Sequence, residues 1–199
     1  MGNKAKPPVD LLGDEGLNPI IRAYFEFNQL KHLHRRGWLK RGVPKEYCES
    51  VAEHSLAVAV LACWLVDAYF PQLDVCRVIR MALLHDFGEI YAGDIIPGDE
   101  ISTGEKFRLE YDSVARVFTH LPDGEEYLAL WLDFEQGASP EARLVKQVDR
   151  LEMGMQASVY EHQGYENLDE FFESAGVALS DPQLRDLLQE VIDLREEST

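Results

Sequence analysis

The sequence predicts an all-α protein with a single domain, and three observations support this prediction. No segment keeps the period-two alternation of a half-buried strand. Helix start signals recur along the chain at the spacing of ordinary helices. A length of 199 residues suits one domain with a sizeable core. We therefore expect a flexible polar tail over residues 1–17 and one helical domain over residues 18–199.

Start and stop residues predict the first three helices. Asn18-Pro19 is an N-cap followed by proline in the first turn, and its helix should run to about residue 34, before Gly37. Ser50 and Glu53 form a capping box that begins a second helix, ending near residue 71. Asp74 begins a third helix, which should reach about residue 90.

The second half of the chain repeats the same signals. Ser102 with Glu105 caps a fourth helix that should continue to about residue 120, and a fifth covers about residues 125–135. Ser139-Pro140 opens a long sixth helix that closes near Gly164. Two shorter helices are expected over about residues 168–175 and 182–195.

Composition excludes some classes of function. With 19 Lys+Arg against 36 Asp+Glu, the net charge is −17, so we expect no binding of nucleic-acid polymers over a broad face. Solubility alone also accounts for this charge. The three cysteines form no CxxC pair, which favours a reducing, cytoplasmic location. The longest apolar run, residues 56–66, is too short to span a bilayer, so no membrane association is expected.

Two histidines and two aspartates stand out because they lie inside strongly apolar helices. They are His54, the pair His85 and Asp86, and Asp149. Burying such groups is costly unless something satisfies them, and a divalent metal accepts nitrogen and oxygen ligands together. These ligands favour Mn, Co, Fe or Zn over Ca, with Mg as a further candidate. Each residue taken singly would more often be structural, for example a core histidine or an aspartate paired with a neighbouring basic residue.

A further carboxylate, Glu89, accompanies the pair on the third helix. Glu89 is four residues after His85 and three after Asp86, so all three should lie on one helix face. Metal-assisted hydrolysis needs such an acid, because a bound cation lowers the pKa of water and a nearby carboxyl group manages protons. Glu53 is explained by its capping box.

A basic segment interrupts this acidic chain. No acidic residue occurs between Glu26 and Glu46, and the segment contains Lys31, Arg35, Arg36, Lys40, Arg41 and Lys45. Guanidinium groups bind phosphate oxygens bidentately, so Arg35 and Arg36 are candidates for a phosphate site. Trp38 offers a flat surface for a sugar or base. The alternatives are a solvated helix end for the basic residues and a core position for Trp38.

The order His…His-Asp…Asp across helices resembles the HD-domain metal-dependent phosphohydrolases. The surrounding motifs are similar to the 5'-deoxynucleotidase branch of that family, over roughly residues 20–161. They are Arg35-Arg-Gly-Trp38, Glu49-Ser-Val-Ala-Glu-His54, Leu84-His-Asp86 with Glu89, Gly93-Asp94-Ile with Pro97, and Lys146-Gln-Val-Asp149. The resemblance implies a helical HD-domain fold with a central metal site, and a small nucleotide as the substrate.

The resemblance also implies a role for each matching residue. His54, His85, Asp86 and Asp149 would bind the metal. Glu89 would be the acid/base carboxylate, and Asp94 would contact the sugar or assist catalysis. Arg35 or Arg36 would hold the phosphate; because Gly37 precedes the tryptophan here, the pattern Arg-x-Gly-Trp favours Arg35. Trp38 would shape the deoxyribose pocket.

The expected activity is hydrolysis of deoxyribonucleoside 5'-monophosphates to deoxynucleoside and phosphate. Glu89 would either orient the attacking water or protonate the departing 5'-oxygen. Other HD-domain substrates remain as alternatives, namely dNTPs, guanosine tetraphosphate or cyclic nucleotides, as does a non-catalytic nucleotide-sensing module with a structural metal. Related proteins form dimers, so a homodimer is expected, with Trp131 and Phe134 either in the interface or in the core.

Overall fold

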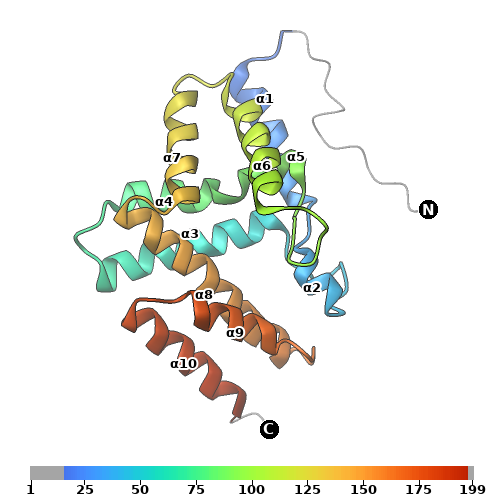
Figure 1. The fold of residues 1–199 in the computed structure, drawn as a ribbon, viewed down its shortest axis with the longest axis vertical. Helices are drawn as coiled ribbons and strands as arrows, with labels where there is room; N and C mark the ends of the chain where they lie inside the picture. Colours follow the sequence, from blue (N-terminus) through green and yellow to red (C-terminus); the bar gives the residue numbers. More distant parts are fainter. Residues whose placement is uncertain (1–15, 197–199) are drawn as a thin grey trace.

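The computed structural model describes residues 16–196, and within that range the regular elements are all helices (Figure 1). The tail expected over residues 1–17 lies almost entirely outside the described residues. Two 3-10 turns, η2 and η3, interrupt the α-helices. In chain order the elements are α1 (Pro19–Phe27), η2 (Asn28–Lys31), α2 (Arg36–Lys40), α3 (Val51–Tyr69), α4 (Val75–Leu84), η3 (His85–Gly88), α5 (Glu89–Ala92), α6 (Thr103–Phe118), α7 (Gly124–Gln136), α8 (Pro140–His162), α9 (Asp169–Ala178) and α10 (Pro182–Glu196).

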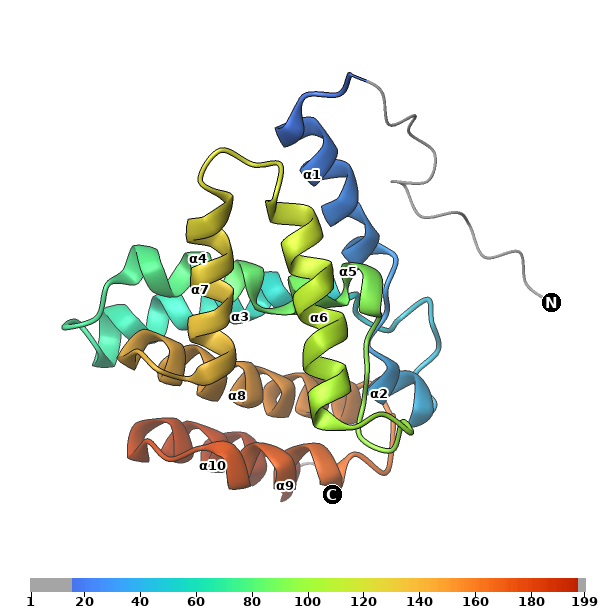
Figure 2. The same cartoon turned by 45° about the horizontal axis from the view of Figure 1, so that its top comes forward.

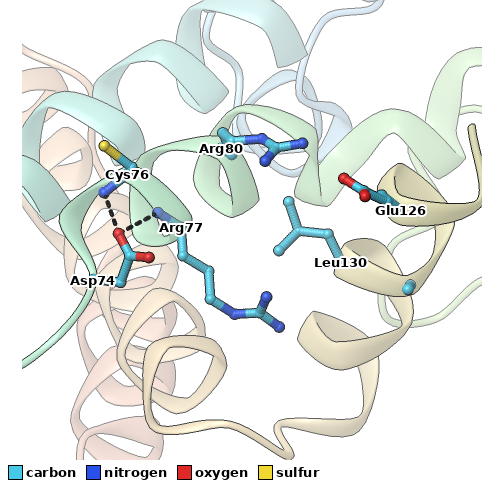
Figure 3. Close-up of a pocket in the computed structure, with 7 residues that line it drawn as sticks. Asp74, Cys76, Arg77, Arg80, Glu126 and Leu130 are labelled. Atoms are coloured by element: carbon cyan, nitrogen blue, oxygen red, sulfur yellow. Dashed lines mark hydrogen bonds between the residues drawn. The ribbon is translucent and has the colours of Figure 1, made fainter. Parts of the chain in front are cut away.

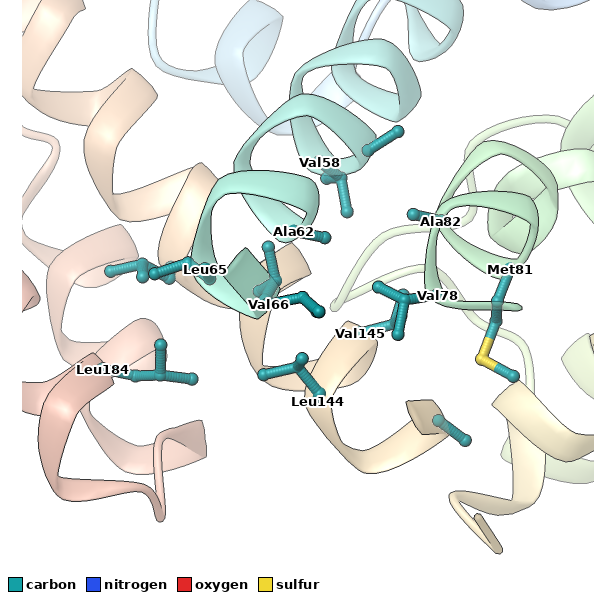
Figure 4. Close-up of a cluster of buried hydrophobic side chains, with 14 of the residues drawn as sticks. Val58, Ala62, Leu65, Val66, Val78, Met81, Ala82, Leu144, Val145 and Leu184 are labelled. Atoms are coloured by element: carbon teal, nitrogen blue, oxygen red, sulfur yellow. The ribbon is translucent and has the colours of Figure 1, made fainter. Parts of the chain in front are cut away.

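Helices α3, α4 and α8 form the centre of the fold, and each packs against the other two. Small and β-branched side chains meet between them, including Val58 and Ala62 of α3, Val78 of α4 and Val145 of α8, all fully buried (Figure 4). Helices α9 and α10 cover α8, while α6 and α7 stand against the other side of the centre (Figure 2). This arrangement brings the first turn of α3, the end of α4 and the middle of α8 together.

Helix α3 is apolar on all sides. The capping box predicted at its start is present, because Glu53 N donates to Ser50 Oγ at 3.2 Å and Ser50 N donates to Glu53 Oε2 at 2.6 Å. The helix has 19 residues with a hydropathy of 1.5, so by length and composition alone it is long enough to cross a membrane. Its inner face is packed in the core, as in the central helix of a globular domain, whereas Leu56, Val60 and Trp64 on its outer face are exposed.

The first predicted helix is shorter than expected. It ends at Phe27 instead of about residue 34, and Gly37 lies inside α2 rather than ending a helix. A long-range contact prevents a helix from reaching residue 34, because His34 forms an isolated bridge with Ser50. Val51 N donates to Leu33 O at 2.8 Å, and Arg35 N donates to Glu49 O at 3.1 Å. Extended backbone at this point cannot also be helical.

The third predicted helix is interrupted at its most important residues. Helix α4 ends at Leu84, and His85–Gly88 forms the 3-10 turn η3 before α5 begins. The His85 side chain donates to the carbonyl oxygen of Ala82 at 2.7 Å, which competes with the helical backbone pattern. Helix α6 also crosses η3 closely at Gly88. The remaining predicted helices, from α6 to α10, agree with the structure within a few residues at each end.

Candidate metal centre

Four predicted ligands from three parts of the chain meet at one point. His54 lies in α3, His85 and Asp86 in η3, and Asp149 in α8. His54 Nε2 is 3.0 Å from Asp149 Oδ1 and 3.7 Å from Asp86 Oδ2. His85 Nε2 is 3.2 Å from Asp86 Oδ2 and 4.0 Å from Asp149 Oδ1. Two ligands each about 2.1 Å from one ion are at most about 4.2 Å apart, so all four separations suit a shared cation.

Hydrogen bonds turn both imidazoles toward this point. His85 Nδ1 donates to the carbonyl oxygen of Ala82 at 2.7 Å, and its buried Nε2 has no hydrogen-bond partner among residues 16–196. His54 Nδ1 donates to Glu152 Oε2 at 2.7 Å. A histidine that donates through one ring nitrogen offers the other to a metal, and such outer partners are typical of metal sites. The donor set therefore fits a divalent transition metal.

The ionisable groups compensate one another in the cation-free protein. Burial and the charge of Arg35 lower the pKa of His54, but hydrogen bonds with Asp149 and Glu152 outweigh them and raise that pKa to about 10. Burial alone would raise the pKa of Asp149, but the charge and hydrogen bond of His54 hold it well below its ordinary value. The positive charge of the His54 imidazolium thus balances the buried carboxylates. A bound cation would replace the Nε2 proton and supply that positive charge.

Glu89 lies beside the ligands as a buried carboxyl group. Its side chain is buried, and Oε2 has no hydrogen-bond partner in the described part of the chain. Burial, followed by the charges of Asp86 and Asp94, raises the pKa of Glu89 well above its ordinary value. A raised pKa favours the protonated form of Glu89, the form that can donate a proton.

The two adjacent arginines point to different places. Arg35 Nη1 lies 3.5 Å from Asp86 Oδ2, so this guanidinium faces the candidate ligands. Burial lowers the pKa of Arg35, but the surrounding carboxylates, Asp86 first, raise it above its ordinary value and keep the group charged. Arg36 instead binds both carboxylate oxygens of Asp99, at 2.6 and 2.9 Å. Of the two, Arg35 is therefore the one positioned to meet a phosphate group.

Arg36 also fixes the position of Asp94. The backbone N–H of Arg36 donates to Asp94 Oδ2 at 2.5 Å, and its guanidinium donates to Asp94 O at 2.7 Å. Asp94 is buried and lies in the loop that follows α5. Arg36 thus holds the loop that carries Asp94, a role that the sequence pattern did not indicate.

Trp38 is placed in the core, as in the second interpretation of the sequence. Its side chain is 1% exposed, and its ring lies against Phe171 and Tyr160, with centroids 4.0 and 5.2 Å away. The indole Nε1 donates to Glu49 Oε1 at 2.8 Å. The other basic residues of the segment lie outside the site; Arg41, for example, pairs with Glu170.

Sequence reasoning missed Glu152 and Glu49. Together with His54 these residues form a second group whose ligand atoms all lie within 4.8 Å of one another. Glu152 had a usable signal, because it follows Asp149 by three residues on one helix face, inside an apolar stretch. Glu49 had no such signal in the sequence, since its position depends on contacts with Trp38 and Tyr160.

A cavity of about 310 Å³ lies elsewhere, between α4 and α7 (Figure 3). Its lining consists of Asp74, Cys76, Arg77, Arg80, Glu126, Ala129 and Leu130, none of which belongs to the metal centre. Arg77 is held there by Asp133 at 2.6 Å. The cavity therefore plays no part in the chemistry of the four ligands.

Comparisons with known proteins identify the family of the chain. The model of the HD domain family matches residues 27–191. The 5'-deoxynucleotidase HDDC2 of Bos taurus is 35% identical over 190 residues, covering 92% of this chain and 89% of that protein. The 5'-deoxynucleotidase hdd1 of Schizosaccharomyces pombe is 32% identical over 178 residues, covering 85% and 87%.

Solved structures share the fold as well. The PH0347 protein from Pyrococcus horikoshii has a TM-score of 0.74 and 33% identity, covering 86% of this chain and 97% of that one. A protein from Magnetospirillum magnetotacticum, described as a predicted metal-dependent phosphohydrolase, has a TM-score of 0.68 and 26% identity, covering 88% and 90%.

Proposed function

The chain belongs to the HD domain family, and we propose that it is a metal-dependent 5'-deoxynucleotidase that converts deoxyribonucleoside 5'-monophosphates to deoxynucleoside and phosphate. Relatives named 5'-deoxynucleotidase match most of the chain and most of their own length. One observation carries the proposal: the Nε2 atoms of His54 and His85 each lie within 4.0 Å of a carboxylate oxygen of both Asp86 and Asp149, beside Arg35 and Glu89.

His54, His85, Asp86 and Asp149 would hold the metal. Two nitrogen and two oxygen donors suit Mn, Co, Fe or Zn, with Mg as a further candidate. When bound, the cation supplies positive charge to the phosphoryl oxygens and lowers the pKa of water.

The charged groups around the ligands have separate roles in binding the phosphate and in transferring protons. Arg35 binds the phosphate through its fork of N–H donors and exchanges its contact with Asp86 for one with the substrate. Water attacks phosphorus as the bond to the departing 5'-oxygen breaks, and Glu89, whose pKa is raised by burial, is suited to give a proton to that oxygen, which favours the acid role over the orientation of water. Asp94, fixed by Arg36, supports this by keeping the pKa of Glu89 high.

Phosphate release tests the proposal directly. The purified chain is stripped of metal, loaded with Mn²⁺ or Co²⁺, and assayed with a panel of dNMP, NMP and dNTP. We expect release from dNMP above the other classes. Asp86→Ala should abolish it, while Asp67→Ala, which removes an exposed aspartate at the far end of α3, should leave it unchanged. Turnover by Asp86→Ala at the wild-type rate would contradict the proposal.

The same panel separates the alternatives. Faster release from dNTP, guanosine tetraphosphate or a cyclic nucleotide would indicate another HD-type phosphohydrolase. Tight dNMP binding without release under every metal would indicate a nucleotide-sensing module.

A homodimer and a cytoplasmic location are also part of the proposal. Trp131 and Phe134, which the sequence left between interface and core, are buried in the core. The exposed outer face of α3 supports a dimer instead: Leu56, Val60 and Trp64 form an apolar stripe, with the exposed Glu53 and Asp67 at its two ends, that a second copy would cover. Light scattering should give a dimer mass for the wild type and a monomer mass for Trp64→Glu; a monomeric wild type would contradict it.

A further inference from the structure

A second layer of carboxylates lies behind His54, on the side away from the other three ligands. Glu152 accepts the His54 Nδ1–H at 2.7 Å, and Glu49 lies beside both. His54 and Glu152 are buried and Glu49 is partly buried. Carboxylates in such surroundings are costly, so they persist where each has defined partners.

Glu49 has partners on both sides. Its Oε1 accepts the indole N–H of Trp38 at 2.8 Å. Its backbone N–H donates to the Tyr160 hydroxyl at 2.9 Å, and its carbonyl oxygen accepts from Arg35 N at 3.1 Å. Glu49 therefore connects the segment that carries Arg35 and Trp38 with helix α8, which carries Glu152.

We propose that Trp38 is a positioning residue for the metal site, acting through Glu49 and Glu152 to fix the orientation of His54, and that it does not contact the sugar of the substrate. The indole N–H holds Glu49, a ligand atom of Glu49 lies within 4.8 Å of those of Glu152 and His54, and Glu152 sets the tautomer of His54 by accepting its Nδ1 proton. A carboxylate in that position raises the basicity of a ligand histidine, and its loss typically lowers metal affinity by about 10–100-fold.

The burial of Trp38 supports this role over a contact with deoxyribose. The side chain is 1% exposed, and its ring is covered by Phe171 and Tyr160. A ring that formed a wall of the sugar pocket would present a face to it. The two roles also predict changes in different quantities. A sugar contact affects the selectivity between dNMP and NMP, whereas a positioning role affects the affinity for metal.

Metal affinity is measured by calorimetric titration of the metal-free protein with Mn²⁺. Glu152→Gln should weaken binding by about 10–100-fold. Trp38→Phe, which keeps a ring but removes the N–H, should weaken it several-fold, and Glu49→Ala should do the same from the other end of the link. The double variant Trp38→Phe/Glu49→Ala should be no weaker than the worse single variant, because both changes break one connection.

Phe171→Leu is the matched control. It disturbs the packing of Trp38 but leaves the indole N–H and Glu49 in place. Its metal affinity should stay within about twofold of the wild type, and equal weakening in Phe171→Leu and Trp38→Phe would reduce Trp38 to a packing residue. Wild-type affinity in Trp38→Phe would overturn the proposal. If Trp38→Phe fails to fold, Glu49→Ala decides in the same way.

A second measurement compares substrates and therefore rests on the proposed function. The ratio of kcat/KM for dNMP to that for NMP should be the same in Trp38→Phe and wild type at saturating Mn²⁺. A changed ratio with unchanged metal affinity would show that Trp38 contacts the sugar. If the wild type releases no phosphate from any nucleotide, the proposed function fails, while the metal titration still tests the positioning role.

Discussion

Gly88 is the point at which the fold constrains the metal centre most tightly. This glycine ends η3, two residues after the candidate ligand Asp86, and α6 crosses it directly. A Cβ at this position would lie 2.7 Å from Glu110 Cβ, 3.0 Å from its Cγ and 3.2 Å from its Cα. Because Glu110 Cα is backbone, rotation of the Glu110 side chain cannot relieve the overlap. Gly88→Ala must therefore push η3 and α6 apart.

The expected cost follows from these distances. An ordinary carbon–carbon contact is about 3.5 Å or longer, so α6 would have to shift by about 0.8 Å. Overpacking of this kind costs about 1–3 kcal/mol. Alanine recovers about 0.5–1 kcal/mol of backbone entropy, which leaves a loss of up to about 2.5 kcal/mol. For a chain of this size the melting temperature should fall by up to about 10 °C.

Thermal unfolding of the metal-free protein, followed by circular dichroism, measures this loss. Gly104→Ala is the control, because it lies in α6, has ordinary helical backbone and would meet no heavy atom within 4 Å. That variant should be up to about 1 kcal/mol more stable than the wild type. If Gly88→Ala melts at or above the temperature of Gly104→Ala, the close approach of α6 to η3 is not as described.

Three further changes test the electrostatics and the capping of the site. The Nε2 proton of His54, whose pKa is raised to about 10, must leave when a cation binds, so Mn²⁺ affinity should rise with pH below that pKa, by up to about tenfold per pH unit. Titrations in buffers of different ionisation enthalpy count the protons released, and a pH-independent affinity between pH 6 and 9 would contradict the assignment. Arg35→Lys should raise the KM for dNMP by about 10–100-fold, because a lysine cannot bind phosphate bidentately, whereas Lys45→Arg should not change it; an unchanged KM in Arg35→Lys would remove Arg35 from the phosphate site. Ser50→Ala removes the N-cap of α3 and should cost about 1 kcal/mol in chemical denaturation, and an unchanged midpoint would mean that the capping box adds nothing.

The ligands could be predicted from the sequence because their signal is local and chemical. His54 follows a capping box by one residue, and His85, Asp86 and Asp149 lie in apolar segments of the sequence, where unpaired polar groups are costly. Most helix starts were predictable for the same reason, since a cap involves residues close in sequence.

The parts that could not be predicted depend on contacts between distant residues. The break of the third helix at His85 involves α6, which approaches at Gly88. The different directions of Arg35 and Arg36 depend on Asp94 and Asp99, some 60 positions later in the chain. No pattern within a window of a few residues contains this information.

Helices α3 and α8 and the turn η3 meet at the metal centre, and His54 and Asp149 face one another across 95 positions of sequence. A cation bound there would act as a removable cross-link between segments that otherwise meet at that point through polar contacts such as the one between His54 and Asp149. Such a cross-link stabilises the folded state most when it closes a long loop. The supply of metal to the cell would then govern both how fast this protein works and how firmly its three central segments are held together.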